Sequence, residues 1–223
     1  MLVKIFGAAV QGVDATIVTI EVNTSRGVKF FLVGLPDTAV KESHERIRAA
    51  LGNTGYKVPT AQITVNMAPA DIRKEGSAYD LPIAIGILAA SDIIVTERLQ
   101  RYLIMGELGL DGNLMPIKGA LPIAIKAREL GYEGFILPSQ NAREAAVVNN
   151  LNVYGVDNIV QVIQFLNGEA TLEPTIVNTR EEFYAHQELF EFDFSDVKGQ
   201  DNDRRILALA HERITGIPAE IED

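Results

Sequence analysis

A serine and a lysine lie close together just before an apolar stretch, and their types and spacing could support hydrolysis. In RKEGSAYDLPIAIGIL, residues 73–88, Lys74 precedes Ser77 by three positions, and Gly76 lies between them. A serine hydroxyl becomes a nucleophile when a neighbouring base accepts its proton, and a lysine amine can be that base. The stretch therefore predicts either a Ser-Lys hydrolytic site or a glycine-containing loop that only resembles one.

Two other kinds of site are not supported by the sequence. GLPDTAVKES, residues 34–43, lies between an expected strand and an expected helix, as a phosphate loop does. It lacks the second glycine, however, and Asp37 takes the cap position, where a carboxylate repels phosphate. No G-x-x-x-x-G-K-[ST] motif occurs in the 223 residues. There is no cysteine, and His44, His186 and His211 are too scattered to bind a metal together, so we expect no metal site.

The composition is that of a globular protein, and its charge is unevenly distributed. Hydrophobic residues make up 47% of the chain, which is enough for a substantial core. Residues 1–167 include 15 basic and 16 acidic residues, whereas residues 168–223 include 5 basic and 14 acidic ones, so the net charge of −10 belongs mainly to the C-terminal quarter. The N-terminus lacks the pattern of a signal peptide, and no apolar run is long enough to span a membrane. We therefore expect a cytoplasmic protein without a membrane partner.

The hydrophobic pattern alternates between strands and helices as far as residue 167. TIVTIEV and VKFFLV, residues 16–22 and 28–33, are separated by turn residues and predict a hairpin. Asp37 is expected to cap the next helix, and Asp80 to cap an apolar helix that is buried on every side. This mixture predicts an α+β sandwich. The remaining expected elements are a strand over 61–69, two strands within 102–119 around the turn 111–113, helices over 119–131, 140–150 and 158–168, and strands over 134–138 and 151–156.

Three long stretches resemble one known family. They are FLVGLPDTAVKESHERIRAAL, TVNMAPADIRKEGSAYDLPIAIGIL and LIMGELGLDGNLMPIKGALPIAIKARELGYEGFILP. Together they look like the N-terminal, ChlI-type domain of Mg-chelatase-like, ComM-type AAA+ proteins, and the resemblance covers residues 1–167. That domain is similar to the proteolytic domain of Lon peptidases and to the C-terminal domain of RadA recombination proteins. The resemblance implies the ribosomal protein S5 domain 2-like α+β fold.

The comparison with Lon peptidases tests the candidate serine and lysine position by position. Lon peptidases carry K-D-G-P-S-A-G with the serine as nucleophile, and KEGSAYD lies over it with Ala78 at the nucleophile position. Their lysine lies in P-I-G-G-L-K, over which PIKGAL places Leu121. The resemblance therefore implies a loop that has lost its catalytic pair, which leaves Ser77 without a base. The alternative is a rearranged pair of Ser77 with Lys74 or Lys118.

The C-terminal part predicts a connector followed by the beginning of a second module. Residues 168–193 form an acidic connector, and residues 194–223 resemble the first part of the AAA+ ATPase module of the same family, truncated before its Walker A loop. The chain is then either a fragment of a longer protein or a naturally truncated one. By itself it is not expected to be an enzyme or to bind a cofactor, because ATP and Mg are implied only for the missing module.

The resemblance implies a non-catalytic accessory domain of a ComM-type AAA+ ATPase that remodels DNA, by helicase or branch-migration activity. The full-length protein is then expected to be a ring homo-oligomer, and this domain to contact DNA or a neighbouring subunit. Arg73, Lys74 and Lys118, basic residues beside the altered cleft, are the candidates for that contact. A protein-interaction and assembly module without DNA binding is the alternative. A Lon-like peptidase is a third interpretation, which Ala78 and Leu121 oppose.

Overall fold

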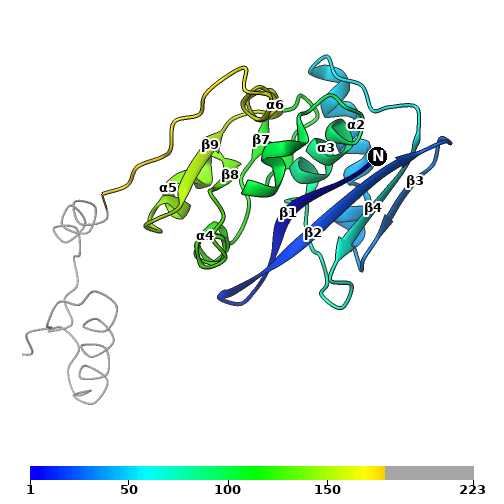
Figure 1. The fold of residues 1–223 in the computed structure, drawn as a ribbon. Helices are drawn as coiled ribbons and strands as arrows, with labels where there is room; N and C mark the ends of the chain where they lie inside the picture. Colours follow the sequence, from blue (N-terminus) through cyan, green and yellow to red (C-terminus); the bar gives the residue numbers. More distant parts are fainter. Residues whose placement is uncertain (179–223) are drawn as a thin grey trace, which may run out of the picture. The chain divides into compact units, whose positions relative to one another are not determined.

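The computed structural model describes residues 1–178, and Met1–Val177 form a compact unit built on a seven-stranded mixed sheet (Figure 1). The strand order is β3-β4-β2-β1-β5-β8-β9, and a separate two-stranded sheet pairs β6 with β7. Four of the six neighbouring pairs in the large sheet are parallel. The expected mixture of helices and strands is therefore confirmed. The strands are β1 (Leu2–Gln11), β2 (Asp14–Ser25), β3 (Phe30–Val33), β4 (Gln62–Ala68), β5 (Tyr102–Ile104), β6 (Glu107–Leu108), β7 (Leu114–Met115), β8 (Gly134–Pro138) and β9 (Asn152–Val156).

The first hairpin joins β1 to β2. The prediction that residues 16–22 and 28–33 form a hairpin is wrong. β1 pairs with β2 antiparallel over its whole length, ending with Gln11 opposite Asp14. β3 lies on the far side of β4 and is parallel to it, so the segments 16–22 and 28–33 are not neighbours in the sheet. The N-terminal segment explains the difference, because β1 offers ten residues to pair with β2 and β3 offers four.

β3 and β4 run side by side, and a glycine allows the chain to leave β3 close to its neighbour. β4 shows the predicted alternation, with Ile63, Val65 and Met67 buried. Gly34, directly after β3, has φ +103°, and a Cβ atom added to it would lie 2.1 Å from the Met67 carbonyl oxygen. Only a residue without a Cβ atom adopts this angle so close to a neighbouring backbone. Gly34 thus sets the path from the sheet into the first helix.

Three helices in the first half confirm two expectations and correct one. The helix expected after Asp37 forms as two pieces that meet at Glu42, and Asp37 caps the first piece by accepting a hydrogen bond from the Val40 N–H. The third helix packs on β1 and β2 with all ten residues buried, as its lack of a polar face predicts. Asp80 does not cap it, because Tyr79 has the cap position and Asp80 is the first helical residue. These helices are α1 (Thr38–Lys41), α2 (Ser43–Asn53) and α3 (Asp80–Ala89).

The second half of the unit alternates parallel strands with helices. β5, β8 and β9 are parallel neighbours that extend the sheet away from β1. The segment expected as two strands forms three, because β5 joins the large sheet while β6 and β7 pair with each other across the turn 111–113. The helices and strands expected after it are all present. The helices here are the 3-10 helix η1 (Thr96–Arg101), α4 (Ala120–Glu129), α5 (Ser139–Ala146) and α6 (Ile159–Asn167).

After α6 the described chain contacts β9. Leu172 packs against the core, and the Thr175 N–H donates to the Val153 carbonyl at 2.7 Å. Residues 168–177, the first part of the expected connector, thus belong to the compact unit. The rest of that connector and the expected beginning of an ATPase module lie in residues 179–223, outside the described residues. No helix within the described part is long and apolar enough to cross a bilayer.

Candidate functional site

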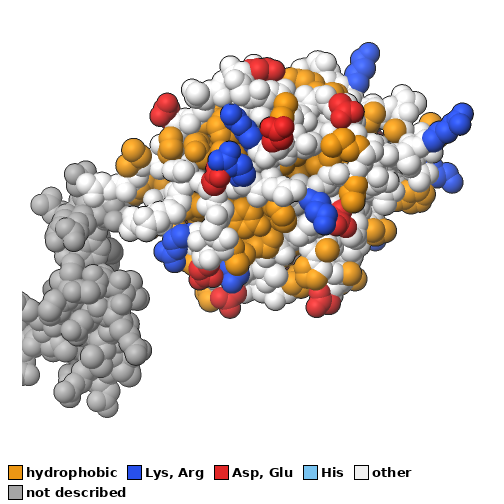
Figure 2. Space-filling view, viewed as in Figure 1, with side chains coloured by type: hydrophobic (Ala, Val, Ile, Leu, Met, Phe, Trp, Pro, Cys, Tyr) orange, Lys and Arg blue, Asp and Glu red, His pale blue; other side chains and the backbone are white. Residues whose placement is uncertain are grey.

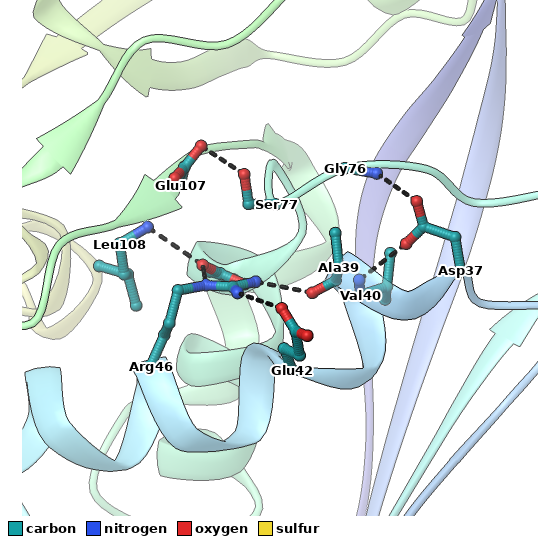
Figure 3. Close-up of polar contacts among 10 residues, drawn as sticks. Asp37, Ala39, Val40, Glu42, Arg46, Gly76, Ser77, Glu107 and Leu108 are labelled. Carbon is teal, nitrogen blue, oxygen red and sulfur yellow. Dashed lines mark hydrogen bonds and ion pairs between the residues drawn. The ribbon is translucent and has the colours of Figure 1, made fainter.

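The loop before α3 is held against the beginning of α1 by one carboxylate. The Lys74 N–H donates to the Leu35 carbonyl at 3.2 Å, and the Lys74 carbonyl accepts from the Asp37 N–H at 3.0 Å. The Asp37 carboxylate accepts from the Val40 N–H at 2.8 Å and from the Gly76 N–H at 3.0 Å (Figure 3). The same side chain therefore caps α1 and fixes the backbone one residue before the serine.

Ser77 has a carboxylate as its partner. Its hydroxyl donates to Oε2 of Glu107 on β6 (Figure 3), and its backbone carbonyl accepts from the Asp80 N–H at 3.0 Å. A carboxylate is a far weaker base than a neutral amine, so this contact orients the hydroxyl but offers its proton a poorer acceptor than a lysine would. Through Ser77 the loop is tied to the two-stranded sheet.

Lys74, the other half of the candidate pair, is buried inside the loop. Its side chain has no exposed surface, and its Nζ donates to the Pro69 carbonyl. Burial lowers the pKa of this ammonium group, and Asp71 opposes that change. The prediction that Lys74 contacts DNA or a partner is therefore wrong, because a side chain without exposed surface cannot reach a phosphate. Among the described residues neither Lys74 nor Lys118 hydrogen-bonds to Ser77, so no rearranged pair is formed.

The other residues selected from the sequence do not form a reactive group. Arg73 is exposed and forms an ion pair with Glu75 at 3.1 Å, and Lys118 is exposed beyond β7. Ala78 is partly buried in the loop, and Leu121 is 36% exposed in the first turn of α4. Neither Ala78 nor Leu121 can transfer a proton. The two positions at which the resemblance to Lon peptidases implies a catalytic pair therefore hold no side chain that can transfer a proton.

A charged pair that the sequence analysis missed joins α2 to the beginning of α3. Arg46 donates through Nε to Asp80 Oδ2 at 2.7 Å and through Nη2 to Asp80 Oδ1 at 2.9 Å. The Leu108 N–H also donates to Asp80 Oδ2, at 3.3 Å, and Arg46 Nη2 donates to the Ala39 carbonyl at 2.8 Å (Figure 3). The Asp80 side chain is fully buried, and that of Arg46 is 21% exposed. The only clue in the sequence was a lone carboxylate at the beginning of an otherwise apolar helix.

The electrostatics of this pair are those of a structural contact. Burial raises the pKa of the Asp80 carboxyl, and the hydrogen bonds and charge of Arg46 act against that rise. The same hydrogen bonds raise the pKa of Arg46. A buried carboxylate with a two-pronged guanidinium partner and a backbone donor has most of its hydrogen-bonding capacity satisfied. It is therefore suited to hold α2, α3 and β6 together.

Comparison of the sequence with known proteins shows which family it belongs to. The sequence model of the family described as subunit ChlI of Mg-chelatase matches residues 20–141, more than half of the chain. The chain belongs to this Mg-chelatase-like family. It is 41% identical over 210 residues to the competence protein ComM of Haemophilus influenzae, covering 94% of this chain and 41% of ComM. It is 39% identical over 205 residues to the uncharacterized protein YifB of Escherichia coli, covering 90% of this chain and 39% of YifB.

Membership of the Mg-chelatase-like family confirms the resemblance to ChlI-type domains of ComM-type AAA+ proteins. The matched residues include the loop before α3 with its serine, and also Asp37, Arg46, Asp80 and Glu107. The chain spans about two fifths of the length of the curated relatives it matches.

We expect Ser77 to remain unmodified by a serine-reactive phosphonate probe, because its hydroxyl is held by a carboxylate and no lysine contacts it. Intact-protein mass spectrometry after incubation with the probe measures this, with an active serine peptidase in a parallel reaction as the positive control. Glu107→Gln should also stay unlabelled, since an amide is no better a base. A probe adduct that appears in the parent and disappears in Ser77→Ala would show that the loop is catalytic.

Proposed function

We propose that this chain is a non-catalytic accessory domain of a ComM-type, Mg-chelatase-like AAA+ ATPase, with an S5 domain 2-like fold. The observation that carries the proposal is the set of contacts made by the loop before α3. Ser77 donates to Glu107, and Ala78 and Leu121, which the resemblance to Lon peptidases places at the catalytic positions, cannot transfer a proton. The loop is thus fixed by contacts that serve the fold, and the family relation supplies the wider context.

In this proposal the full-length protein remodels DNA with energy from ATP. ATP and Mg are bound by the AAA+ module, which also forms the ring, and the whole protein works in the cytoplasm. The domain described here contacts DNA or a neighbouring subunit through its surface. Of the three contact candidates chosen from the sequence, Arg73 and Lys118 have the exposure that this role needs.

The test is the salt dependence of DNA binding by the 223-residue chain. Neutralised phosphates release counterions, so log K is expected to fall linearly with log salt, by about 0.9 per contacted phosphate of a duplex and about 0.7 for a single strand. Fluorescence anisotropy of labelled oligonucleotides over a salt series measures the slope. Added ATP should leave the binding unchanged, because the chain has no Walker A loop. Absence of binding to any oligonucleotide at low salt would remove DNA contact from the function.

The alternative, an assembly module without DNA binding, is favoured by an exposed apolar patch. Val10 and Val13 lie at the β1–β2 turn and are 37% and 87% exposed, and Leu121 and Ile125 on α4 are each 36% exposed. Gly119, just before α4, lies against Val10, so α4 begins beside the end of β1. Concentration-dependent association in sedimentation experiments, combined with no DNA binding, would select this alternative.

A further inference from the structure

Three exposed cations lie in the two segments that lead to one end of the sheet, the turn from β2 into β3 and the segment before β4. Arg26 and Lys29 are in that turn, and Lys57 is in the segment that leads from α2 to β4. The Lys29 carbonyl accepts a hydrogen bond from the Ile63 N–H at 2.8 Å, which fixes the turn beside the beginning of β4. Figure 2 shows Lys and Arg side chains projecting into solvent at the end where β2 and β3 meet in Figure 1. We call Arg26, Lys29 and Lys57 the basic end.

The basic end has no acidic counterpart in the part of the chain that the structure describes. The segments 22–36 and 46–70, which contain the three cations, have no aspartate or glutamate. None of the ion pairs within residues 1–178 involves Arg26, Lys29 or Lys57. In a chain whose net charge is −10, this is a local positive field, and such a field attracts a polyanion.

An exposed aromatic ring adjoins these cations. Phe31 is 44% exposed on β3, the edge strand of the sheet. Phe31 lies on the exposed side of β3 together with Val33, and Lys29 precedes it by two residues in the turn. Phe30 points to the opposite side and stacks on His44 at 4.3 Å, so its ring is not free. The register places Thr64 of β4 next to Phe31, which puts a hydroxyl beside the exposed ring.

One carboxylate on this face of the sheet, that of Glu21, is already neutralised. Glu21 lies in register with Asn66, which in turn lies beside Val33 on β3. The Asn66 amide donates to the Glu21 carboxylate at 3.0 Å, and Lys4 forms an ion pair with the same carboxylate at 3.3 Å. Both contacts lower the pKa of Glu21. Its charge is therefore balanced locally and does not cancel the field of the basic end.

We propose that the basic end and Phe31 bind single-stranded nucleic acid. The cations contact successive phosphates, and the ring of Phe31 stacks on a base. Cations that follow the backbone, combined with an aromatic platform for the bases, are the usual means of binding a single strand without reading its sequence. A duplex keeps its base faces stacked inside, so it can use the cations but not the ring. The inference rests on the proposed function and moves the DNA contact away from the loop before α3.

The experiment compares the parent chain with two triple variants of equal charge change. Arg26→Gln/Lys29→Gln/Lys57→Gln removes the basic end, and Lys41→Gln/Arg101→Gln/Arg128→Gln removes three exposed cations elsewhere. Binding of labelled oligo(dT) and of a duplex of the same length is measured by anisotropy over a salt series. The first variant should lose affinity for oligo(dT), and its salt slope should fall by about 2, which is three contacts at about 0.7 each. The second should bind as the parent does. Thermal unfolding of each variant checks that the fold is retained.

A single substitution tests the stacking separately from the charge. Phe31→Thr keeps a residue suited to an edge strand, and it should weaken binding of oligo(dT) roughly tenfold without changing the salt slope or duplex binding. Unchanged oligo(dT) affinity in Phe31→Thr, or parent binding to the duplex as tight as to the single strand, would overturn the inference. So would equal losses in both triple variants, since that is a general effect of net charge.

The outcomes also separate this inference from the proposed function. If both triple variants bind oligo(dT) as the parent does, DNA contact stands and the basic end is the wrong surface. If the parent binds no oligonucleotide at low salt, both the inference and the DNA-contact role are wrong.

Discussion

Replacing Arg46 by methionine is expected to lower the free energy of unfolding by about 3–5 kcal/mol, because the fully buried Asp80 carboxylate loses its charged partner. Methionine keeps much of the apolar stem, so the loss reports the charge and the hydrogen bonds. Urea denaturation at neutral pH measures it. The matched control is Lys126→Met, which removes the cation of an exposed ion pair with Glu129 and should change stability by less than about 1 kcal/mol.

The pH dependence of the same variant gives a second check with a defined sign. Burial already raises the pKa of Asp80 in the folded protein above the ordinary value of 3.8, and loss of Arg46 should raise it further. Between 3.8 and the raised value, the folded state binds the proton more tightly than the unfolded state, so stability falls as the pH rises through this window. The free energy of unfolding of Arg46→Met should therefore be closest to that of the parent at acidic pH. A deficit that stays constant down to the unfolded value would show that the buried charge is not its cause.

Gly34→Ala should destabilise the protein by about 3 kcal/mol or more, for two reasons that act together. The residue has φ +103°, which is unfavourable for alanine, and the new Cβ atom would lie 2.1 Å from the Met67 carbonyl oxygen. Because that neighbour is backbone, β3 has to move away from β4 to relieve the overlap. Urea denaturation and the thermal midpoint measure the effect.

Gly55→Ala is the matched control for that substitution. Gly55 has φ +87°, but no atom lies within 4 Å of an added Cβ atom, so this variant carries only the cost of the backbone angle, about 1–2 kcal/mol. The difference between the two variants isolates the contact with Met67. Equal losses in both would mean that the close approach of Gly34 to β4 contributes nothing.

The elements predicted correctly from the sequence are those that depend on residues close together in the chain. Three alternating apolar residues of β4, the unbroken apolar run of α3 and the cap at Asp37 each depend on residues a few positions apart. Strand pairing is not local in this way. The segment of β3 follows β2 through a short turn, which favours a hairpin, yet β1 is the longer partner and takes the place beside β2.

The same holds for the candidate site: what depends on residue type could be predicted from the sequence, and contacts between distant residues could not. That Ala78 and Leu121 cannot transfer a proton follows from their chemistry alone. The burial of Lys74 does not follow from the sequence, because a lysine in a glycine-containing loop is ordinarily exposed. The contact between Arg46 and Asp80 joins residues 34 positions apart, and no spacing rule connects an arginine on one helix to an aspartate at the beginning of another.

The position of β1 inside the sheet has a consequence for synthesis of the chain. β1 pairs with β2 almost at once, but its other neighbour is β5, and Phe6 meets Leu103 only after 97 further residues have been made. The hairpin is complete at Ser25, so 78 residues separate it from Leu103, and at ordinary translation rates of about 5–20 residues per second its free edge waits about 4–16 s for that partner. An unpaired strand edge invites pairing with another chain, and a charged side chain discourages it. On β1 that protection is a single charged residue, Lys4. Misassembly of this fold is therefore most favoured between chains that are being made side by side on the same messenger RNA.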